Sequence, residues 1–272
     1  MIKGATKEGR SANADYVERQ ALSDYLALGY VPHDGTEAST GQDTTIFGDT
    51  SKVWGSAATT LEYGVADFAL AAFAAEQGDA AACRAAVARS RGWTLLLDPE
   101  TRHIRPRRAD GSYLTPFDPA SGEGFAEGNS AQYTWMIPYD VAGLAAALGG
   151  TDAARARLDD FFTTLDAGPG APYAFLGNEP GWISPFLYDW LGAPSRTQDV
   201  VRRAILALFS AALNGYVGND DLGQMSAWYV FTALGFYPVA PGSNEYAIGR
   251  PFLGRAVLNL PNGKRFAIVA ER

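Results

Sequence analysis

The feature that most constrains this chain is a helical pattern that runs from residue 13 to about residue 235. Apolar residues recur there at three- and four-residue spacing, and the breaks carry Gly, Pro, Asn or Asp. One helix is expected to begin at Thr59, which can form a capping box with Glu62, and to stop at Gly78, after which Asp79 caps the next helix. The pattern predicts further helices, in series as hairpins, over residues 140–148, 151–165, 185–191, 194–213 and 224–234.

Composition narrows the function classes. A chain of 272 residues with 47% hydrophobic and 19% charged residues can bury a sizeable core, which argues against disorder. The net charge of −8 has the wrong sign for phosphate backbones, so no nucleic acid partner is expected. One cysteine, Cys83, cannot form an internal disulfide, and His33 and His103 are too few for a histidine-built zinc centre. Apolar stretches stay short of the roughly 18 residues that a membrane span needs.

The connections between helices differ in length, and the longest are polar. Residues 117–130, 167–184 and 214–223 are rich in Gly, Asn, Asp, Glu and Trp, whereas the turns between them are short. This asymmetry predicts one functional end of the molecule. After Pro241 the pattern changes to two strand-like runs, residues 255–260 and 265–269, joined by a Pro-Asn-Gly-Lys hairpin turn.

Each long loop carries carboxylates between aromatic and amide side chains. Taken singly, these acids have structural explanations. Asp220 or Asp221 could cap the helix that begins near Gln224, and Glu127 or Glu179 could be solvated or paired with arginines. Taken together, three acidic loops flanked by Trp, Tyr and Asn offer the stacking faces and hydrogen bonds that suit a sugar. The combination favours a carbohydrate-processing site.

Two carboxylates on opposite sides of a glycosidic bond are enough for hydrolysis. One is kept protonated and donates to the leaving oxygen, and the other is ionised and activates water or attacks the sugar. Glu127 suits the acid role because its immediate neighbours bring no positive charge to lower its pKa. Asp221, beside Asp220 and Asn219, suits the base role.

The same loops carry candidate metal ligands. Asn178, Glu179 and the paired aspartates offer hard oxygen donors, and no His or Cys lies near them in the sequence. Such a set favours calcium over zinc if a metal binds at all. From the residues alone, calcium is therefore only one of the open alternatives.

Three segments closely resemble the alpha-mannosidases of glycoside hydrolase family ninety-two. They are GFAEGNSAQYTWMIPYD, GNEP followed by PFLYDWLGAPSRTQ, and GNDDLGQMSAWYVFTALGFYPVAPGSNEYAIGRP, and TTLEYGVADFALA and LLLDPETRHIRPRRADGSYLTPFDP extend the likeness, which begins at about Gly29. The resemblance implies a mainly α fold that is part of an (α/α)6 toroid of helical hairpins with a short C-terminal β-hairpin. Residues 1–240 would form the partial catalytic barrel, and residues 241–272 the start of a β segment packed on it.

The resemblance also implies an activity and roles for individual residues. The activity is calcium-dependent, exo-acting and inverting hydrolysis of alpha-mannosidic linkages in mannose-containing oligosaccharides or glycoprotein glycans. By motif, Glu127 matches the general acid and Asp221 the general base, with Asp220 or Asn219 assisting. The implied substrate contacts are Asn178, Glu179, Trp182 and Gln132, and the implied calcium ligands are Glu179, Asn178 and Asp221.

The chain departs from the family's pattern in extent. It resembles only the C-terminal part of the catalytic region, and lacks the N-terminal β-sandwich, the first barrel helices and an upstream Trp-Asp-Thr segment. We therefore expect a fragment of a larger polypeptide, with the missing portion as its partner, or a chain that is weakly active or inactive alone. No signal peptide core is present, and family likeness alone indicates a secreted or periplasmic protein.

A second departure is Gly181-Trp182-Ile183, where family members often carry a polar residue such as His or Gln. It leaves open the linkage preference and one calcium contact. Trp182 either stacks under a leaving-group sugar or packs as a buried aromatic residue. Two other functions also stay open: a non-catalytic mannoside-binding or structural fragment, and a glycosidase of the same helical fold that acts on glucosides.

Overall fold

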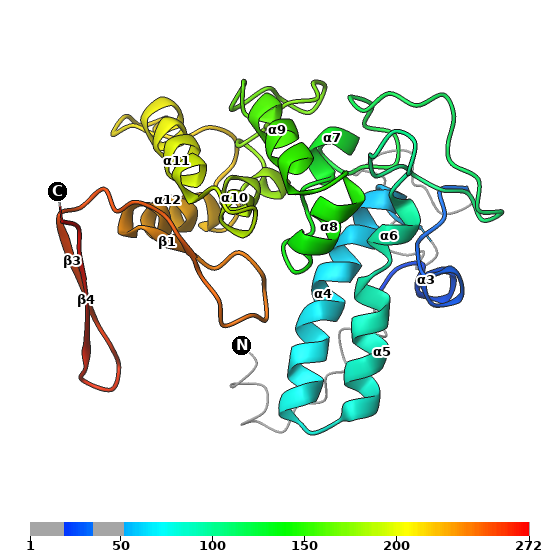
Figure 1. Cartoon of the computed structure of the whole chain (residues 1–272), viewed down its shortest axis with the longest axis horizontal. Coiled ribbons are helices and arrows are strands. Elements are labelled where there is room, and N and C mark those ends of the chain that lie inside the picture. The colour runs from blue at the N-terminus through cyan, green and yellow to red at the C-terminus, as the bar shows by residue number, and fades with distance from the viewer. Residues whose placement is uncertain (1–18, 35–51, 272) are drawn as a thin grey trace.

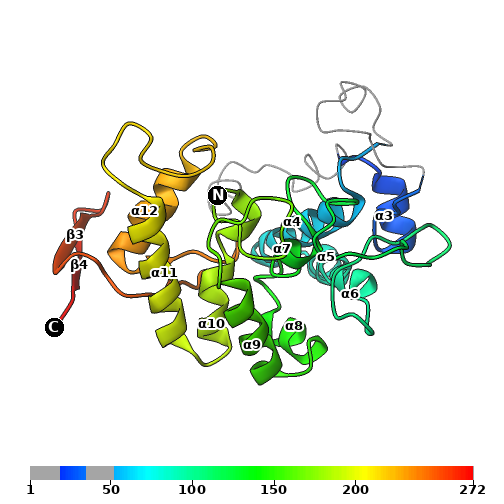
Figure 2. The same ribbon diagram turned by 90° about the horizontal axis from the view of Figure 1, so that it is seen from above.

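The computed structural model describes residues 19–34 and 52–271, and helices are the principal secondary structure of this part (Figure 1). The first half contains α3 (Leu22–Leu28), α4 (Ser56–Glu76), α5 (Ala80–Ser90), α6 (Trp93–Leu96) and α7 (Ser130–Tyr133). The second half contains α8 (Val141–Ala147), α9 (Thr151–Phe161), the 3-10 turns η2 (Glu179–Gly181) and η3 (Ser184–Phe186), α10 (Leu187–Trp190), α11 (Pro194–Leu208) and α12 (Gln224–Leu234). The predicted helical hairpins are present as the packed pairs α4 with α5, α8 with α9, and α10 with α11 (Figure 2). Closure into a toroid stays a prediction.

The predicted capping box at Thr59 is wrong. Helix α4 begins three residues earlier, at Ser56, and the free N–H groups of Ala57 and Ala58 donate to the carbonyl of Gly124. A tertiary contact therefore accepts the N-terminal hydrogen bonds that a capping side chain would accept in an isolated helix. Because α4 begins at Ser56, Glu62 lies in the second turn and is too far from the start to cap it. The next prediction is confirmed: the Asp79 side chain accepts from two backbone N–H groups at the start of α5.

Helix ends with explicit local signals fall close to their predicted places. Asp140 caps α8, and α12 runs from Gln224 to Leu234, where Gly235 adopts the left-handed conformation. Helix α11 ends at Leu208, short of the predicted residue 213, because Phe209 turns into an extended conformation. The Phe209 ring then stacks on Trp228 with the ring centroids 5.7 Å apart.

The core runs without interruption from α4 to α12. Its largest fully buried side chains include Trp135, Trp182, Trp228, Tyr188 and Phe186. Its polar groups are paired as well, since the Trp228 indole Nε1 donates a hydrogen bond to the Trp182 backbone carbonyl at 3.0 Å. Burial of several aromatic residues of this size supplies much of the hydrophobic stabilisation of a domain, at roughly 25 cal/mol per Å² of apolar surface.

Strands follow the last helix. The predicted hairpin is present as β3 (Arg255–Asn259) and β4 (Arg265–Val269), antiparallel with Arg255 opposite Val269, and it extends away from the helices (Figure 1). A second pair, β1 (Phe236–Tyr237) with β2 (Ala247–Ile248), was not predicted. These two-residue strands lie on either side of residue 240, where the division into a barrel and a β segment stays a prediction. No helix in residues 19–34 or 52–271 is long and apolar enough to cross a membrane.

Candidate active site

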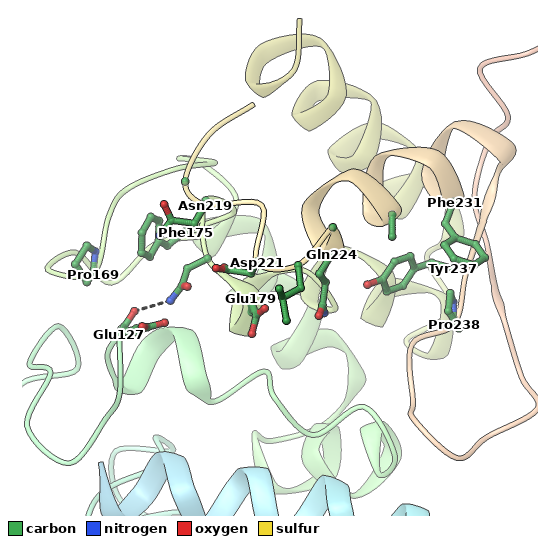
Figure 3. Close-up of a pocket in the computed structure, with 16 residues that line it drawn as sticks. Glu127, Pro169, Phe175, Glu179, Asn219, Asp221, Gln224, Phe231, Tyr237 and Pro238 are labelled. Atoms are coloured by element: carbon green, nitrogen blue, oxygen red, sulfur yellow. Dashed lines mark hydrogen bonds between the residues drawn. The ribbon is translucent and has the colours of Figure 1, made fainter. Parts of the chain in front are cut away.

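Three loops surround one hollow of about 1070 Å³ (Figure 3). They are the long loops that the sequence analysis singled out, and α12 and the segment after it complete the wall. The residues predicted for the site that line the hollow are Glu127, Asn178, Glu179, Asn219 and Asp221. The rest of the wall is mainly apolar or aromatic and includes Phe175, Phe231, Tyr237 and Pro238. Carboxylates and amides set among aromatic faces are suited to binding a polar ring such as a sugar.

Local contacts fix the position of Glu127. Its backbone is in the left-handed region, with φ of 57°, a conformation that costs free energy in a residue with a side chain. Asn178 Nδ2 donates to the Glu127 carbonyl at 2.8 Å, as the dashed line in Figure 3 marks. The Tyr133 hydroxyl donates to the preceding carbonyl, that of Ala126. The strained segment is thus held from both sides, and this fixes the direction of the Glu127 side chain.

The two Gly-Asn motifs meet backbone to backbone. Gly218 has φ of +66°, and a Cβ built on it would lie 1.8 Å from the carbonyl oxygen of Gly177. No other residue type fits such an approach. Contact between these glycines places Asn178 and Asn219, the residues after them, on the same hollow.

The neighbouring aspartates have different surroundings. Asp220 Oδ1 accepts from the Ser226 backbone N–H at 2.9 Å and from its hydroxyl at 2.8 Å, so Asp220 caps α12 from a distance. Asp221, with φ of 48°, lines the hollow instead. The structural explanation left open for the pair therefore applies to Asp220, and Asp221 is the member available to a ligand.

The carboxylates of the hollow are close enough to repel one another. Burial raises the pKa of Glu179, and the charges of Asp221 and Glu127 raise it further. The pKa of Tyr237 is raised for the same two reasons: burial, and then the charge of Glu179, raise it to about 12. None of the described residues that line the hollow is basic. The site is therefore strongly electronegative, which favours binding of cations and of hydroxyl donors.

Gln132 and Trp182 are not at the hollow. Gln132 Nε2 donates to the carbonyls of Gly168, Ala171 and Tyr173, so Gln132 supports the loop that forms one wall of the site. Trp182 is 1% exposed, and its Nε1 donates to the Leu176 carbonyl at 3.0 Å. The 3-10 turn after Asn178 directs this indole into the core, where it offers no face to a sugar in this structure.

Comparison with known proteins shows the family of this chain. The family described as Glycosyl hydrolase family 92 catalytic domain matches residues 1–272. The chain belongs to this family. The membership places it among the glycoside hydrolases and confirms the resemblance seen in the loop motifs.

Solved relatives have the same fold. One is a family GH92 alpha-mannosidase from Bacteroides thetaiotaomicron in complex with mannoimidazole, which is 30% identical in sequence and superposes with a TM-score of 0.79. The match covers 98% of this chain and 34% of the mannosidase chain. Another is a family GH92 inverting mannosidase from Bacteroides thetaiotaomicron, which is 33% identical in sequence with a TM-score of 0.78. This match covers 92% of this chain and 34% of the mannosidase chain. This chain therefore spans about a third of the length of these relatives.

A curated relative adds information about compartment. An uncharacterized secreted glycosidase from Arthroderma benhamiae is 32% identical over 127 residues, which is 47% of this chain and 16% of the relative. Its description as secreted is in keeping with the compartment expected from family likeness.

Sequence reasoning missed one acidic residue near the site. Glu62 lies on α4, and its side chain is exposed. Partial desolvation of its carboxyl, and then the charge of Glu179, raises the pKa of Glu62. Its charge also helps, after burial, to raise the pKa of Tyr133. The sequence pattern gave Glu62 the role of capping-box partner of Thr59, and the same helix carries two further acids, Asp67 and Glu76, so the pattern does not single out Glu62.

The donor chemistry of the hollow fits a hard cation. Glu179 and Asp221 offer carboxylates, and Asn178 keeps its amide oxygen available because its Nδ2 is the atom bonded to Glu127. No group of three or more His, Cys, Asp and Glu side chains in the described ranges is arranged to hold an ion by itself. A calcium ion there would need amide, backbone, water or sugar oxygens as well, which are ligands that calcium accepts.

Proposed function

We propose that the polypeptide containing this chain is an exo-acting alpha-mannosidase that hydrolyses alpha-linked mannose with inversion. Its substrate would be a mannose-containing oligosaccharide or a glycoprotein glycan. One observation carries the proposal: Glu127, Glu179 and Asp221, from three loops far apart in the sequence, line a single hollow. Family membership and the printed activities of the solved relatives support the choice of mannose.

Glu127 and Asp221 would share the chemistry. The protonated Glu127 carboxyl donates its proton to the glycosidic oxygen as the bond to the mannose C1 breaks. Asp221 accepts a proton from a water molecule, and the water oxygen forms the new bond to C1 from the opposite face. The products are the shortened glycan, which leaves with the proton from Glu127, and beta-mannose. A hollow of about 1070 Å³ has room for a hexose together with the attacking water.

Calcium would bind at Glu179, Asn178 and Asp221. Bound there, the ion would hold sugar hydroxyls in place and offset the negative charge of the neighbouring carboxylates. Asn178 would have a second task that needs no ion, since its amide N–H group fixes the Glu127 backbone. The partner that completes the catalytic region would be the remaining part of the same polypeptide, and the compartment would be extracellular or periplasmic.

Proton NMR of mannobiose hydrolysis tests the mechanism. We expect the anomeric signal of beta-mannose to appear first and the alpha signal to follow at the rate of mutarotation. The control is free beta-mannose followed under the same conditions. Alpha-mannose as the first product would show retention, and would rule out Asp221 as a base acting through water.

Removal of calcium tests the ligand set. Treatment with a chelator should lower the hydrolysis rate by at least tenfold, and added calcium should restore it, because the carboxylates then lose the cation that offsets their repulsion. Glu179→Gln should weaken calcium binding, measured by titration calorimetry, whereas Glu123→Gln in an exposed part of another loop should not. A full rate in excess chelator would remove calcium from the proposal and leave the acid and base unaffected.

A further inference from the structure

Tyr237 lies on the wall of the catalytic hollow at the end far from Glu127 (Figure 3). Its ring is held in place by aromatic neighbours. The Phe186 ring stacks on it with the centroids 4.7 Å apart and the planes 5° apart, and the Phe231 ring meets it edge-on at 6.2 Å. Phe186 is fully buried, and the backbone of Tyr237 pairs with Ala247 in the β1–β2 ribbon. The direction of the Tyr237 hydroxyl is therefore fixed before any ligand binds.

The Tyr237 hydroxyl is an unused donor that opens into the hollow. The side chain is only 8% exposed, and no hydrogen bond of its hydroxyl is found within residues 19–34 and 52–271. The hydroxyl is also not among the unpaired side-chain atoms of this part of the chain that are closed off from solvent. In Figure 3 it points toward Gln224, which lines the same hollow. Native structures keep few buried polar groups without a partner, so this arrangement indicates an acceptor supplied by a ligand.

The charge around this hydroxyl favours a sugar as that ligand. Burial, and then the charge of Glu179, raises the pKa of Tyr237 to about 12, so the phenol stays protonated at neutral pH and can donate. A sugar hydroxyl accepts a hydrogen bond from a phenol and at the same time donates one to a carboxylate or an amide oxygen. Tyr237, Glu179 and Gln224 provide these groups on one wall of the hollow.

The position of Glu127 indicates which sugar of the substrate meets Tyr237. This step rests on the proposed function, in which Glu127 protonates the glycosidic oxygen, so that the leaving sugar lies on the Glu127 side of the broken bond. Tyr237 lies at the other end, and Glu179 and Asp221 stand between the two residues in Figure 3. The sugar that reaches Tyr237 is therefore the terminal mannose.

We propose that Tyr237 is a substrate-binding residue whose hydroxyl donates a hydrogen bond to one hydroxyl group of the terminal mannose. The stacked Phe186 ring and the edge-on Phe231 ring hold the donor ready, so little side-chain entropy is lost when the sugar binds. A preset donor of this kind discriminates against a sugar that lacks the matching hydroxyl, because the donor is then left unpaired.

Tyr237→Phe tests the contact in the complete polypeptide that contains this chain. It should lower kcat/KM roughly 3- to 10-fold, the loss expected for one neutral hydrogen bond. The loss should be the same for mannobiose and for a dinitrophenyl mannoside, because the two substrates share the terminal mannose and differ in the leaving group. A loss confined to mannobiose would place the contact on the leaving sugar and would overturn the proposal.

Stability separates a binding role from a structural one. The ring packing remains in Tyr237→Phe, and the hydroxyl has no partner in the described ranges, so the unfolding temperature should equal or exceed that of the wild type. A lower unfolding temperature would show that the hydroxyl stabilises the fold and would contradict the proposal. Tyr246→Phe is the matched control, since Tyr246 packs on Phe236 of the same ribbon, is 52% exposed and does not line the hollow. It should keep wild-type kinetics.

Deoxygenated substrates identify the mannose hydroxyl and give the decisive result. The substrates are dinitrophenyl mannosides that lack the hydroxyl at C2, C3, C4 or C6, each assayed with the wild type and with Tyr237→Phe. At one position, Tyr237→Phe should cost no further activity, because the hydrogen bond is already absent from the deoxygenated substrate. Differences in intrinsic reactivity cancel, since they affect both enzymes equally. Losses that multiply independently at all four positions would overturn the proposal.

The wild-type reaction shows which proposal has failed if one does. A wild type that hydrolyses none of the mannosides would refute the proposed function, and this inference with it. A wild type that hydrolyses them, together with a Tyr237→Phe variant of equal kcat/KM, would refute the role of Tyr237 alone and leave the mannosidase activity established.

Discussion

Glu127→Gln should lower kcat for mannobiose by roughly 10²- to 10⁴-fold, the usual contribution of a positioned general acid. Glutamine has nearly the same shape as glutamate, and the contacts that hold this residue use backbone carbonyls, so the variant should fold normally. Only the transferable proton is lost. The measurement is steady-state hydrolysis of mannobiose by the variant and the wild type at the same calcium concentration.

The leaving group provides the control for this prediction. A dinitrophenyl mannoside leaves as a stable phenolate and needs little protonation, so Glu127→Gln should slow its hydrolysis far less than that of mannobiose. Asp221→Asn should slow both substrates to a similar degree, because each still needs an activated water. If Glu127→Gln slowed both substrates equally, Glu127 would be a positioning residue, and the acid would have to be another carboxyl in or near the hollow.

Glu62 would then be the first residue to consider. Desolvation and the charge of Glu179 raise the pKa of Glu62, and this favours the protonated state that a general acid requires. Glu127 is preferred as the acid because it lines the hollow and lies in the matching family motif, whereas Glu62 does not line the hollow and is linked to it only by the effect of the Glu179 charge on the Glu62 pKa.

The sequence predicted those helix ends that are decided locally. Asp79 and Asp140 cap the helices that follow them, and Gly235 ends α12, because each supplies its own acceptor or backbone conformation. The start of α4 could not be predicted in this way, since its N–H groups are satisfied by the Gly124 carbonyl, almost seventy residues further along the chain. The early end of α11 likewise depends on the stacking of Phe209 on Trp228.

The site was predicted at the level of loops better than at the level of side chains. Acidic and amide residues in three long polar loops indicated a shared site, and the structure brings those loops around one hollow. The sequence could not separate Asp220 from Asp221, because their roles depend on which carboxylate reaches Ser226. It also could not show that Gln132 and Trp182 point away from the hollow, since both belong to motifs in which neighbouring residues do line it.

The backbone conformation of the site residues is the feature of the site that sequence patterns predict least well. Glu127, Asp221 and Leu222 all have positive φ, although none is a glycine and only one is of a type that tolerates this region well. Such strain persists only where surrounding contacts impose it, and here the proposed acid and base both carry it. Their side-chain directions therefore depend on contacts between loops, which makes those contacts as important to activity as the carboxylates.

Gly218→Ala tests that dependence and should lower kcat/KM for mannobiose by roughly 10²-fold, the loss that a misplacement of about 1 Å in a catalytic group can cause. The added methyl group would lie 1.8 Å from the Gly177 carbonyl oxygen, and the φ of +66° is unfavourable to alanine. One of the two loops must then move and take Glu179 or Asp221 with it.

Gly170→Ala is the matched control, because Gly170 lies on the same polar loop as Gly177 and no described atom is within 4 Å of its ideal Cβ. It should retain wild-type activity. Backbone strain of roughly 1–3 kcal/mol at an exposed loop should lower the unfolding temperature of Gly218→Ala only slightly, leaving the helical core folded by circular dichroism. A folded Gly218→Ala protein with full activity would show that the two loops position the carboxylates independently, and the backbone contact between the Gly-Asn motifs would then have no part in catalysis.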